Sequence, residues 1–464
     1  MEAKMSAQFQ SQEQPTIAQL LPVFTELLPV QVVRKLIHDS KKKFYERLFT
    51  PLVVVWGLAF QRLNSDHTCD AALSHIAGGA VDHLDDKHDT PLSERIESES
   101  TSAYCKGRQR LPLSVLKGAL AHTASVTRQW LGEDGLWLGH SVGLLDGSTL
   151  LLRPEQQLVD HYGRHENQYG ETYWVVMRLV VAFDLHSGAV LGMAEGSLHK
   201  SEQELTVSVL AQALPNCVYT GDRNFGVFSV AQAARHYQAD VNVRMTYRRA
   251  KALAGRKMKP GEDMVVTWTP SKHDQLHEGM NSDPITGRLI YVRIQRDGFR
   301  PIDLYLFTSL LDAEVYTLEE LVKLFDFHWH VELNLRYVKS TLDMDLLTAK
   351  SVDMVHKELW AGLLAYNIIR GYMTRAAIQA NLSPLTLSFT RCWRRVHDTL
   401  LAHRPGSTRT VHRLLTRLAK LTLPKRPRFR IEPRAVRRRP VTYPNLKGSR
   451  AEARQRLIEQ LNAA

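Results

Sequence analysis

The stretch TLEELVKLFDFHWHVELNLRYVK, residues 317–339, most constrains what this chain can fold into. It opens with Thr317 followed three residues later by Glu320, a capping-box pattern that predicts a helix starting here and running on to Lys339. At about 100° per residue, one face of that helix would carry Phe325, His328, Glu332 and Lys339. Apolar residues fill much of the remaining circumference, as in a buried helix. A carboxylate on a buried helix needs a partner or a chemical role, which makes Glu332 the first candidate for function.

Length and charge bound the possibilities for the whole chain. A length of 464 residues predicts two to four domains. The apolar fraction of 44% and charged fraction of 23% are those of an ordinary globular protein. The net charge of +12 favours a polyanionic partner, nucleic acid first and a membrane surface second. A basic protein with no nucleic-acid role remains the alternative on charge alone.

The cysteines and the apolar runs indicate the compartment. Four cysteines lie far apart, with no CxxC pair and no Cys/His cluster at zinc spacing, which suits a reducing environment. His161 and His165 are four residues apart but have no Glu at metal-site spacing, so a metal role there is disfavoured. No secretory signal is visible, and the longest apolar run, 51–60, is about half of the roughly 20 residues that a membrane span needs. We expect a cytoplasmic protein with no membrane partner.

The first third of the chain, residues 1–135, predicts an all-α N-terminal domain with a DNA-binding role. Leu, Val, Ile and Phe recur at helical spacing from Thr16 to about Ala80, and 113–131 predicts a further helix. Between them, the segment 102–112 carries Lys and Arg alternating with small or polar residues.

The periodicity changes near Gly139, where an α/β domain is predicted to begin. Its first part, 136–246, is expected to contain a strand, turn and strand at 140–153, a hairpin at 174–198, helices at 201–214 and 227–237, and strands at 217–221 and 239–245. Short strands broken by Gly and Pro then predict a β-rich insertion at 247–300. The second part of the domain, 301–380, is expected to contribute a strand at 303–309, the opening helix and a long helix at 352–377. This order predicts a mixed sheet flanked by helices.

The remaining segment, 381–464, predicts a helical and basic C-terminal region. Its run PKRPRFRIEPRAVRRRP, 424–440, is strongly basic. It is either a solvated tail or an arm that binds phosphates, and the latter is favoured for a nucleic-acid partner.

Two aspartates join Glu332 as candidate catalytic and metal-binding residues. Asp146 ends the apolar run VGLL and Asp222 ends the run CVYTG. Asp beside Gly after a strand also suits a plain turn, and Glu332 could instead pair with Arg336 or Lys339. Phosphodiester cleavage by two divalent ions about 4 Å apart needs several converging carboxylates, because Mg²⁺ prefers oxygen ligands. Two strand-end Asp residues and one helical carboxylate would satisfy that need.

At these residues the chain resembles the IS-four family of bacterial insertion-sequence transposases. That family has D-G-[ST] after its first strand, as in Asp146-Gly147-Ser148, and D-R-x-[FY] after its fourth, as in Asp222-Arg223-Asn224-Phe225. Its third motif is Y-(2)-R-(3)-E-(6)-K, in which Glu332 and Lys339 keep their spacing. The resemblance spans roughly 102–370. It implies an RNase H-like fold and a DDE catalytic triad holding two Mg²⁺ ions, for which Mn²⁺ can substitute.

The resemblance also implies roles for residues around the triad. Lys339, Arg223 and His328 would contact DNA phosphates, and Trp268 in the insertion would stack on a flipped base, although a Trp in a β segment is more often core. Phe325 and His328 stand where the family has Tyr and Arg. Phe cannot donate a hydrogen bond and His is charged only when protonated, so use of a DNA hairpin intermediate stays open.

The implied function is cut-and-paste DNA transposition. Such a protein would bind the terminal inverted repeats of its own element and a target DNA, as a homodimer in the DNA complex, and would associate with the bacterial nucleoid when bound. Two alternatives remain: a metal-dependent nuclease of the same fold without strand transfer, and a catalytically inactive DNA-binding relative.

Overall fold

The computed structural model describes residues 22–44, 47–85, 87–168, 170–212, 216–271, 274, 283–295, 301–401, 408–424 and 449–463. Its strands are β1 (Ser141–Leu152), β2 (Arg164–Asn167), β3 (Gly170–Asp184), β4 (Val190–Ser197), β5 (Cys217–Gly221), β6 (Asp240–Met245), β7 (Asp263–Trp268), β8 (Ile285–Ile294), β9 (Ile302–Thr308) and β10 (Leu346–Leu347). Its helices before β5 are α1 (Pro22–Leu27), α2 (Val30–Asp39), α3 (Pro51–Leu63), α4 (Cys69–Ala77), α5 (Leu92–Arg95), α6 (Ser102–Arg110), α7 (Leu113–Leu131), α8 (Gln156–Tyr162) and α9 (Glu202–Leu210). The later helices are α10 (Phe228–His236), α11 (Tyr247–Ala254), α12 (Leu318–Asp326), α13 (Trp329–Arg336), α14 (Val352–Gln379), α15 (Phe389–Leu401), α16 (Thr408–Ala419) and α17 (Arg450–Asn462).

All the described strands form one sheet. It is mixed, as the sequence predicted for the α/β domain. The hydrogen-bonded order is β2-β3-β1-β5-β6-β9-β8-β7, with β4 also pairing β3 and β10 also pairing β1. The central strands β1, β5 and β6 are parallel, whereas β3, β9, β8 and β7 each run antiparallel to the strand before them in the order. Parallel neighbours need crossover connections, which α9 and α10 provide.

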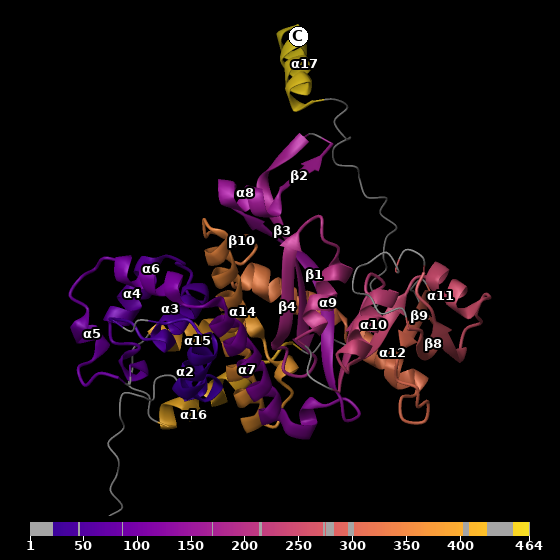
Figure 1. Cartoon of the computed structure of the whole chain (residues 1–464), viewed down its shortest axis with the longest axis horizontal. Coiled ribbons are helices and arrows are strands. Elements are labelled where there is room, and N and C mark those ends of the chain that lie inside the picture. Colours follow the sequence, from indigo (N-terminus) through magenta and orange to yellow (C-terminus); the bar gives the residue numbers. More distant parts are fainter. Residues whose placement is uncertain are drawn as a thin grey trace, which may run out of the picture.

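Helices cover both faces of the central part of the sheet, so β5 and β6 are buried on two sides (Figure 1). One face packs against α12, α13, α14 and the N-terminal helices in a single apolar cluster. The other packs against α9, α10 and α11 in a second cluster. Alternation of side chains along each strand supplies both clusters: Leu144 of β1 belongs to the first and Leu145 to the second.

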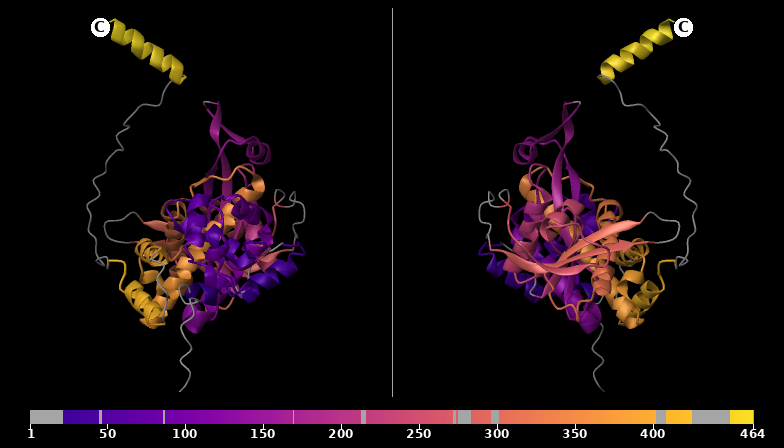
Figure 2. Two further views of the ribbon diagram at one scale, coloured as in Figure 1. Left: turned by 90° about the vertical axis from the view of Figure 1, so that its left-hand side faces the viewer. Right: turned by 90° about the vertical axis from the view of Figure 1, so that its right-hand side faces the viewer.

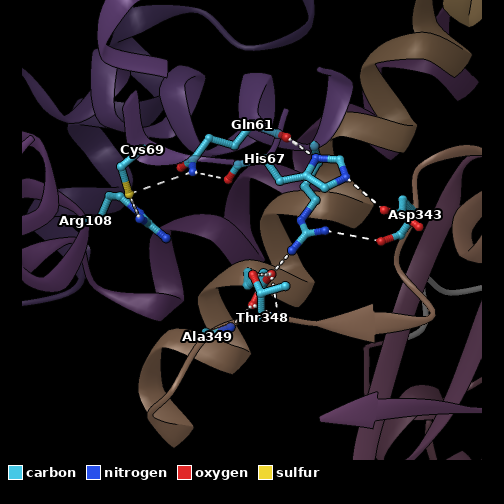
Figure 3. Close-up of polar contacts among 9 residues, drawn as sticks. Gln61, His67, Cys69, Arg108, Asp343, Thr348 and Ala349 are labelled. Atoms are coloured by element: carbon cyan, nitrogen blue, oxygen red, sulfur yellow. Dashed lines mark hydrogen bonds and ion pairs between the residues drawn. The ribbon is translucent and has the colours of Figure 1, made fainter. Parts of the chain in front are cut away.

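The N-terminal helices pack on α14, which is buried along most of its length. A polar network also joins them to the rest of the chain (Figure 3). The buried Arg62 of α3 pairs with Glu358 of α14 and donates to the Asp343 carbonyl at 3.3 Å. Glu358 in turn accepts from the backbone N–H groups of Thr348 and Ala349. The all-α region is therefore anchored to the segment that leads out of the residue 317–339 stretch.

A hairpin of β2 and the first part of β3 stands away from the body of the molecule, with α8 beside it (Figures 1 and 2). Two aromatic residues near its tip are exposed, Tyr173 at 67% and Trp174 at 36%. The sequence predicts no element at 156–162, where α8 forms. It also predicts the start of β3 at Trp174, four residues later than the structure shows.

The expected strand-turn-strand at 140–153 is wrong, because β1 runs unbroken through it. Gly147, Ser148 and Thr149 pair in register with β3, at Val180, Leu179 and Arg178. The polar run D-G-S-T stays extended because β3 is long enough to continue beside it, and no local signal reveals the length of that partner.

The strands predicted as a β-rich insertion are present, and they extend the main sheet rather than forming a separate unit. β8 pairs with β9, and β7 pairs with β8 at the sheet's edge. The buried Arg288 of β8 bonds to Asp263 of β7 and donates to the Tyr316 carbonyl at 2.7 Å, which ties this edge to the loop before α12.

The stretch 317–339 starts as a helix where predicted, but it is not one continuous helix. The Thr317 hydroxyl accepts from the Glu320 N–H and caps α12. The helix then breaks at Phe327 and His328, where the amides of 328, 330 and 331 bond to carbonyls only three residues back. The run FDFHWH has modest helix propensity throughout, which permits a break here without requiring one. α13 follows, and Lys339 lies in a π-helical turn, Tyr337–Thr341.

No helix in the described ranges is long and apolar enough to cross a membrane. The basic run 424–440 lies, apart from Pro424, outside the described residues.

Candidate active site

The sheet register places Asp146 and Asp222 side by side. Leu145 of β1 pairs with Gly221 of β5 in the parallel ladder, and each aspartate is the next residue along its strand. β5 ends at Gly221, so β1 has no neighbour on this side beyond Leu145 until it meets β10 near Leu151. The two carboxylates therefore lie at the opening that β5 leaves in the sheet, which is where ligands bind open α/β sheets.

Backbone amides hold both aspartates in place. The Gly147 N–H donates to Asp146 Oδ1 at 2.8 Å. The Asn224 N–H donates to Asp222 Oδ1 at 2.8 Å, two residues on, in the Asx-turn geometry that Asp favours. The plain turn that the sequence also allows at Asp222 does form, and it leaves the other carboxylate oxygen for a further partner.

The surroundings of Asp146 disfavour its charge. Burial raises the pKa of Asp146 to about 7 from an ordinary 3.8; the Gly147 N–H opposes this rise, and the charges of Asp222, Glu202 and Glu332 add to it. The three acids predicted as catalytic therefore share one electrostatic environment. A fourth acid, Glu202, belongs to it as well.

Glu332 reaches this environment from α13, which packs against β1. Its side chain is exposed rather than buried, contrary to the opening expectation. In the part of the chain that the structure describes, no ion pair joins it to Arg336 or Lys339 (the alternative weighed above). The buried Arg370 of α14 holds α13 in place. Its guanidinium donates to Asn334 Oδ1, and its Cζ lies 5.8 Å from the Tyr337 ring centroid.

Lys339 contacts the Asp146 motif directly. Its Nζ donates to the Thr149 carbonyl at 2.9 Å and to Ser148 Oγ at 3.3 Å. An ammonium carries three donors, so one N–H remains for a further partner. The third residue of D-G-S therefore helps to hold the lysine of E-(6)-K against β1, two to three residues along the strand from Asp146.

His328 and Phe325 lie at the junction of α12 and α13 with their rings stacked, 5.8 Å between centroids. Burial lowers the pKa of His328, and the charge of Asp222 opposes that shift. Its Nδ1 is buried and has no hydrogen-bond partner among the residues that the structure describes. A histidine in this setting is neutral near pH 7, so it would meet a phosphate as a hydrogen-bond donor rather than as a cation.

Arg223 is exposed in the loop after Asp222. Arg249 of α11 holds this loop by donating to the Arg223 carbonyl at 3.0 Å and to the Gly226 carbonyl at 3.3 Å. Arg249 was not selected from the sequence, because an arginine on a short basic helix gives no signal of a distant backbone partner.

Trp268 lies at the end of β7, half-buried. Its ring packs edge-on against Phe307 and Phe228, with centroids 4.8 and 5.9 Å away. It also lines a groove of about 1160 Å³ between α9, α10, α11 and β7. The side chain therefore has one face in the core and one towards an open groove.

The acidic residues fit a hard divalent cation by donor type, since all are carboxylates. Within the described ranges, however, no three His, Cys, Asp or Glu side chains are already close enough to hold a metal ion. Glu202 was missed from the sequence because an acid in the first turn of a helix is ordinarily explained by the helix dipole.

Comparison with known proteins identifies the class. Residues 137–368 match the family described as Transposase DDE domain, a segment that holds β1 to β10 and all three predicted acids. The chain therefore belongs to the DDE transposases, as the motifs predicted.

The particular relationship is to the IS4 element. The chain is 26% identical over 356 residues to "Transposase InsG for insertion sequence element IS4" of Escherichia coli (strain K12), covering 74% of this chain and 78% of that protein. Among solved structures, the piggyBac transposase synaptic complex with hairpin DNA matches with a TM-score of 0.40 and 10% identity, over 89% of this chain and 87% of that chain.

Proposed function

We propose that this chain is the transposase of an insertion sequence, binding the element's terminal inverted repeats and carrying out strand cleavage and strand transfer. The observation that carries the proposal is the register of β1 and β5, which sets Asp146 and Asp222 next to each other at the open end of β5. The choice of Glu332 as the third member is supported by its charge, which helps to raise the pKa of Asp146. The fold assignment that goes with this proposal is an RNase H-like core.

Asp146, Asp222 and Glu332 would hold two Mg²⁺ ions, with Mn²⁺ as a substitute. The chemistry supplied by the ions is activation of the attacking oxygen and stabilisation of the leaving oxygen. The chain's own residues orient the carboxylates through the Gly147 and Asn224 amides. Water would cut one strand, and the freed 3′-OH would then attack target DNA.

The cationic side chains around the acids would hold the DNA backbone. Lys339 is held against the Asp146 motif and keeps one N–H free. Arg223 is exposed beside Asp222. His328 would add a hydrogen bond, and Trp268 would stack a displaced base in the groove that it lines. A homodimer would present two such sites to the two ends of the element.

The test is strand transfer with pre-cut element ends. Purified protein is incubated with Mg²⁺, a duplex ending in the 3′-OH of the inverted repeat, and a supercoiled target plasmid. We expect joined products that disappear in Asp146→Asn and Asp222→Asn. Hydrolysis of the ends without joined products would instead identify a nuclease, and DNA binding with neither product would identify an inactive relative.

A further inference from the structure

Glu202 is positioned against the Asp146 motif by the start of α9. It is the first residue of that helix, whose N-cap Ser201 accepts from the Glu204 N–H and is part of a complete capping box. A β-carbon added at Gly147 would lie 2.3 Å from both Cδ and Oε1 of Glu202. The Glu202 carboxyl therefore occupies the space that a side chain at 147 would fill, one residue along β1 from Asp146, and its charge acts on Asp146.

Asn224 holds the same carboxyl from the other side. Its Nδ2 donates to Glu202 Oε2. The neighbouring Gln203 Nε2 donates to Asn224 Oδ1 at 2.6 Å and to its carbonyl at 3.0 Å. With Oδ1 engaged by Gln203, the amide can only turn its Nδ2 towards Glu202. Since the Asn224 N–H also bonds Asp222, one loop residue fixes both carboxylates.

A helix dipole alone does not account for this arrangement. It favours an acid anywhere in the first turn of α9, and Glu204 already meets that preference while forming the cap. Glu202 instead lies against Gly147 and accepts from Asn224, the residues that hold Asp146 and Asp222 through their backbone amides. No Lys, Arg or His in the described ranges forms an ion pair with it. Grouping like charges is unfavourable unless a cation joins them.

We propose that Glu202 is a fourth carboxylate of the divalent-metal site, supplied by α9 and held ready by Asn224. The inference rests on the proposed function, because it adds a ligand to the site of Asp146 and Asp222. It gives the second residue of D-G-S a role: glycine leaves room for the Glu202 carboxyl. With two divalent ions, four carboxylates balance four positive charges, whereas the triad alone leaves an excess of one.

Metal affinity measured without DNA tests the proposal. Mn²⁺ is titrated into the full chain at pH 8, and the free ion is followed by electron paramagnetic resonance. Glu202→Asp keeps the charge but shortens the reach, and Glu202→Gln keeps the reach but removes the charge. We expect both to bind Mn²⁺ at least about tenfold more weakly than the wild type. Glu204→Gln, which removes a charge from the same helix turn and can keep the cap, should bind as the wild type does.

Gly147→Ala is a second route to the same result, because it displaces the Glu202 carboxyl and leaves its charge on the chain. We expect a similar loss of affinity, with thermal unfolding in EDTA confirming that each variant is folded. Wild-type affinity in Glu202→Asp would overturn the proposal. Coordination by the Glu202 carboxylate would then be unnecessary, and its long-range charge or its role in holding the loop would explain any loss of affinity in Glu202→Gln. Wild-type affinity in Asp146→Asn or Asp222→Asn would instead overturn the proposed function itself.

Discussion

Removing the Asp146 charge should stabilise the protein while abolishing its activity. The pKa of this carboxyl is raised from 3.8 to about 7, first by burial and then by the charges of Asp222, Glu202 and Glu332. Each pKa unit is worth about 1.4 kcal/mol, so the ionised form costs the metal-free fold at most about 4 kcal/mol. Surface exposure and salt reduce that figure in practice.

The pH window follows from the direction of the shift. The folded-state pKa lies above the unfolded value, so the contribution to stability is fully present below pH 3.8 and is lost as the pH rises through about 7. Asp146→Asn has no such titration. The difference in stability between variant and wild type should therefore grow between pH 4 and pH 7 and level off above it.

Urea unfolding in EDTA at pH 5 and pH 8 measures this difference. We expect a higher midpoint for Asp146→Asn, with the larger gain at pH 8, and no such gain for Asp160→Asn, which removes an exposed acid from α8. Adding Mn²⁺ should raise the midpoint of the wild type and not that of the variant. A urea midpoint for Asp146→Asn no higher than that of the wild type at pH 8 would contradict the raised pKa of Asp146.

Three further predictions concern residues around the site. Arg62→Met should cost about 3–5 kcal/mol of unfolding free energy, because it leaves the Glu358 carboxylate buried without its partner; an unchanged urea midpoint would contradict this. Trp268→Ala should cost about 2 kcal/mol of unfolding free energy through lost packing on two Phe rings. Trp268→Phe should keep most of that stability. If neither variant binds element ends more weakly than its loss of stability explains, base stacking by Trp268 is excluded. Lys339→Gln should lower the salt dependence of DNA binding by about 0.9 in slope, and Lys323→Gln, on the exposed side of α12, should not; equal slopes in fluorescence-anisotropy titrations would remove Lys339 from the phosphate contacts.

Local signals identified the elements that depend on local chemistry. The helix at 113–131 begins after Pro112 and ends before Gly132 as predicted, and the Thr317 cap forms as predicted. Both rest on residues that start or stop a helix whatever surrounds them.

Features that depend on a distant partner were not visible in the sequence. The unbroken β1 exists because β3 continues beside D-G-S-T, and the insertion strands join the main sheet through β9. At His328 the only local signal is low helix propensity, and tertiary context decides whether a helix breaks at such a site.

The candidate site divides in the same way. Motif spacing selected Asp146, Asp222 and Glu332, and the register and shared electrostatics bring them to one region of the sheet. Glu202 carried no comparable signal. Its relevance depends on the absence of a side chain at Gly147 and on the orientation of the Asn224 amide, and both are properties of the folded chain.

We propose that Glu332 acts with the two aspartates in one metal-dependent cleavage centre. The most direct test is Mg²⁺-dependent cleavage of a duplex carrying the element's inverted repeat, comparing Glu332→Gln with Glu319→Gln, an exposed acid on α12. Both proteins should bind the duplex and fold alike. We predict that Glu332→Gln loses cleavage by at least about a hundredfold while Glu319→Gln cleaves as the wild type does; undiminished cleavage by Glu332→Gln would contradict the claim.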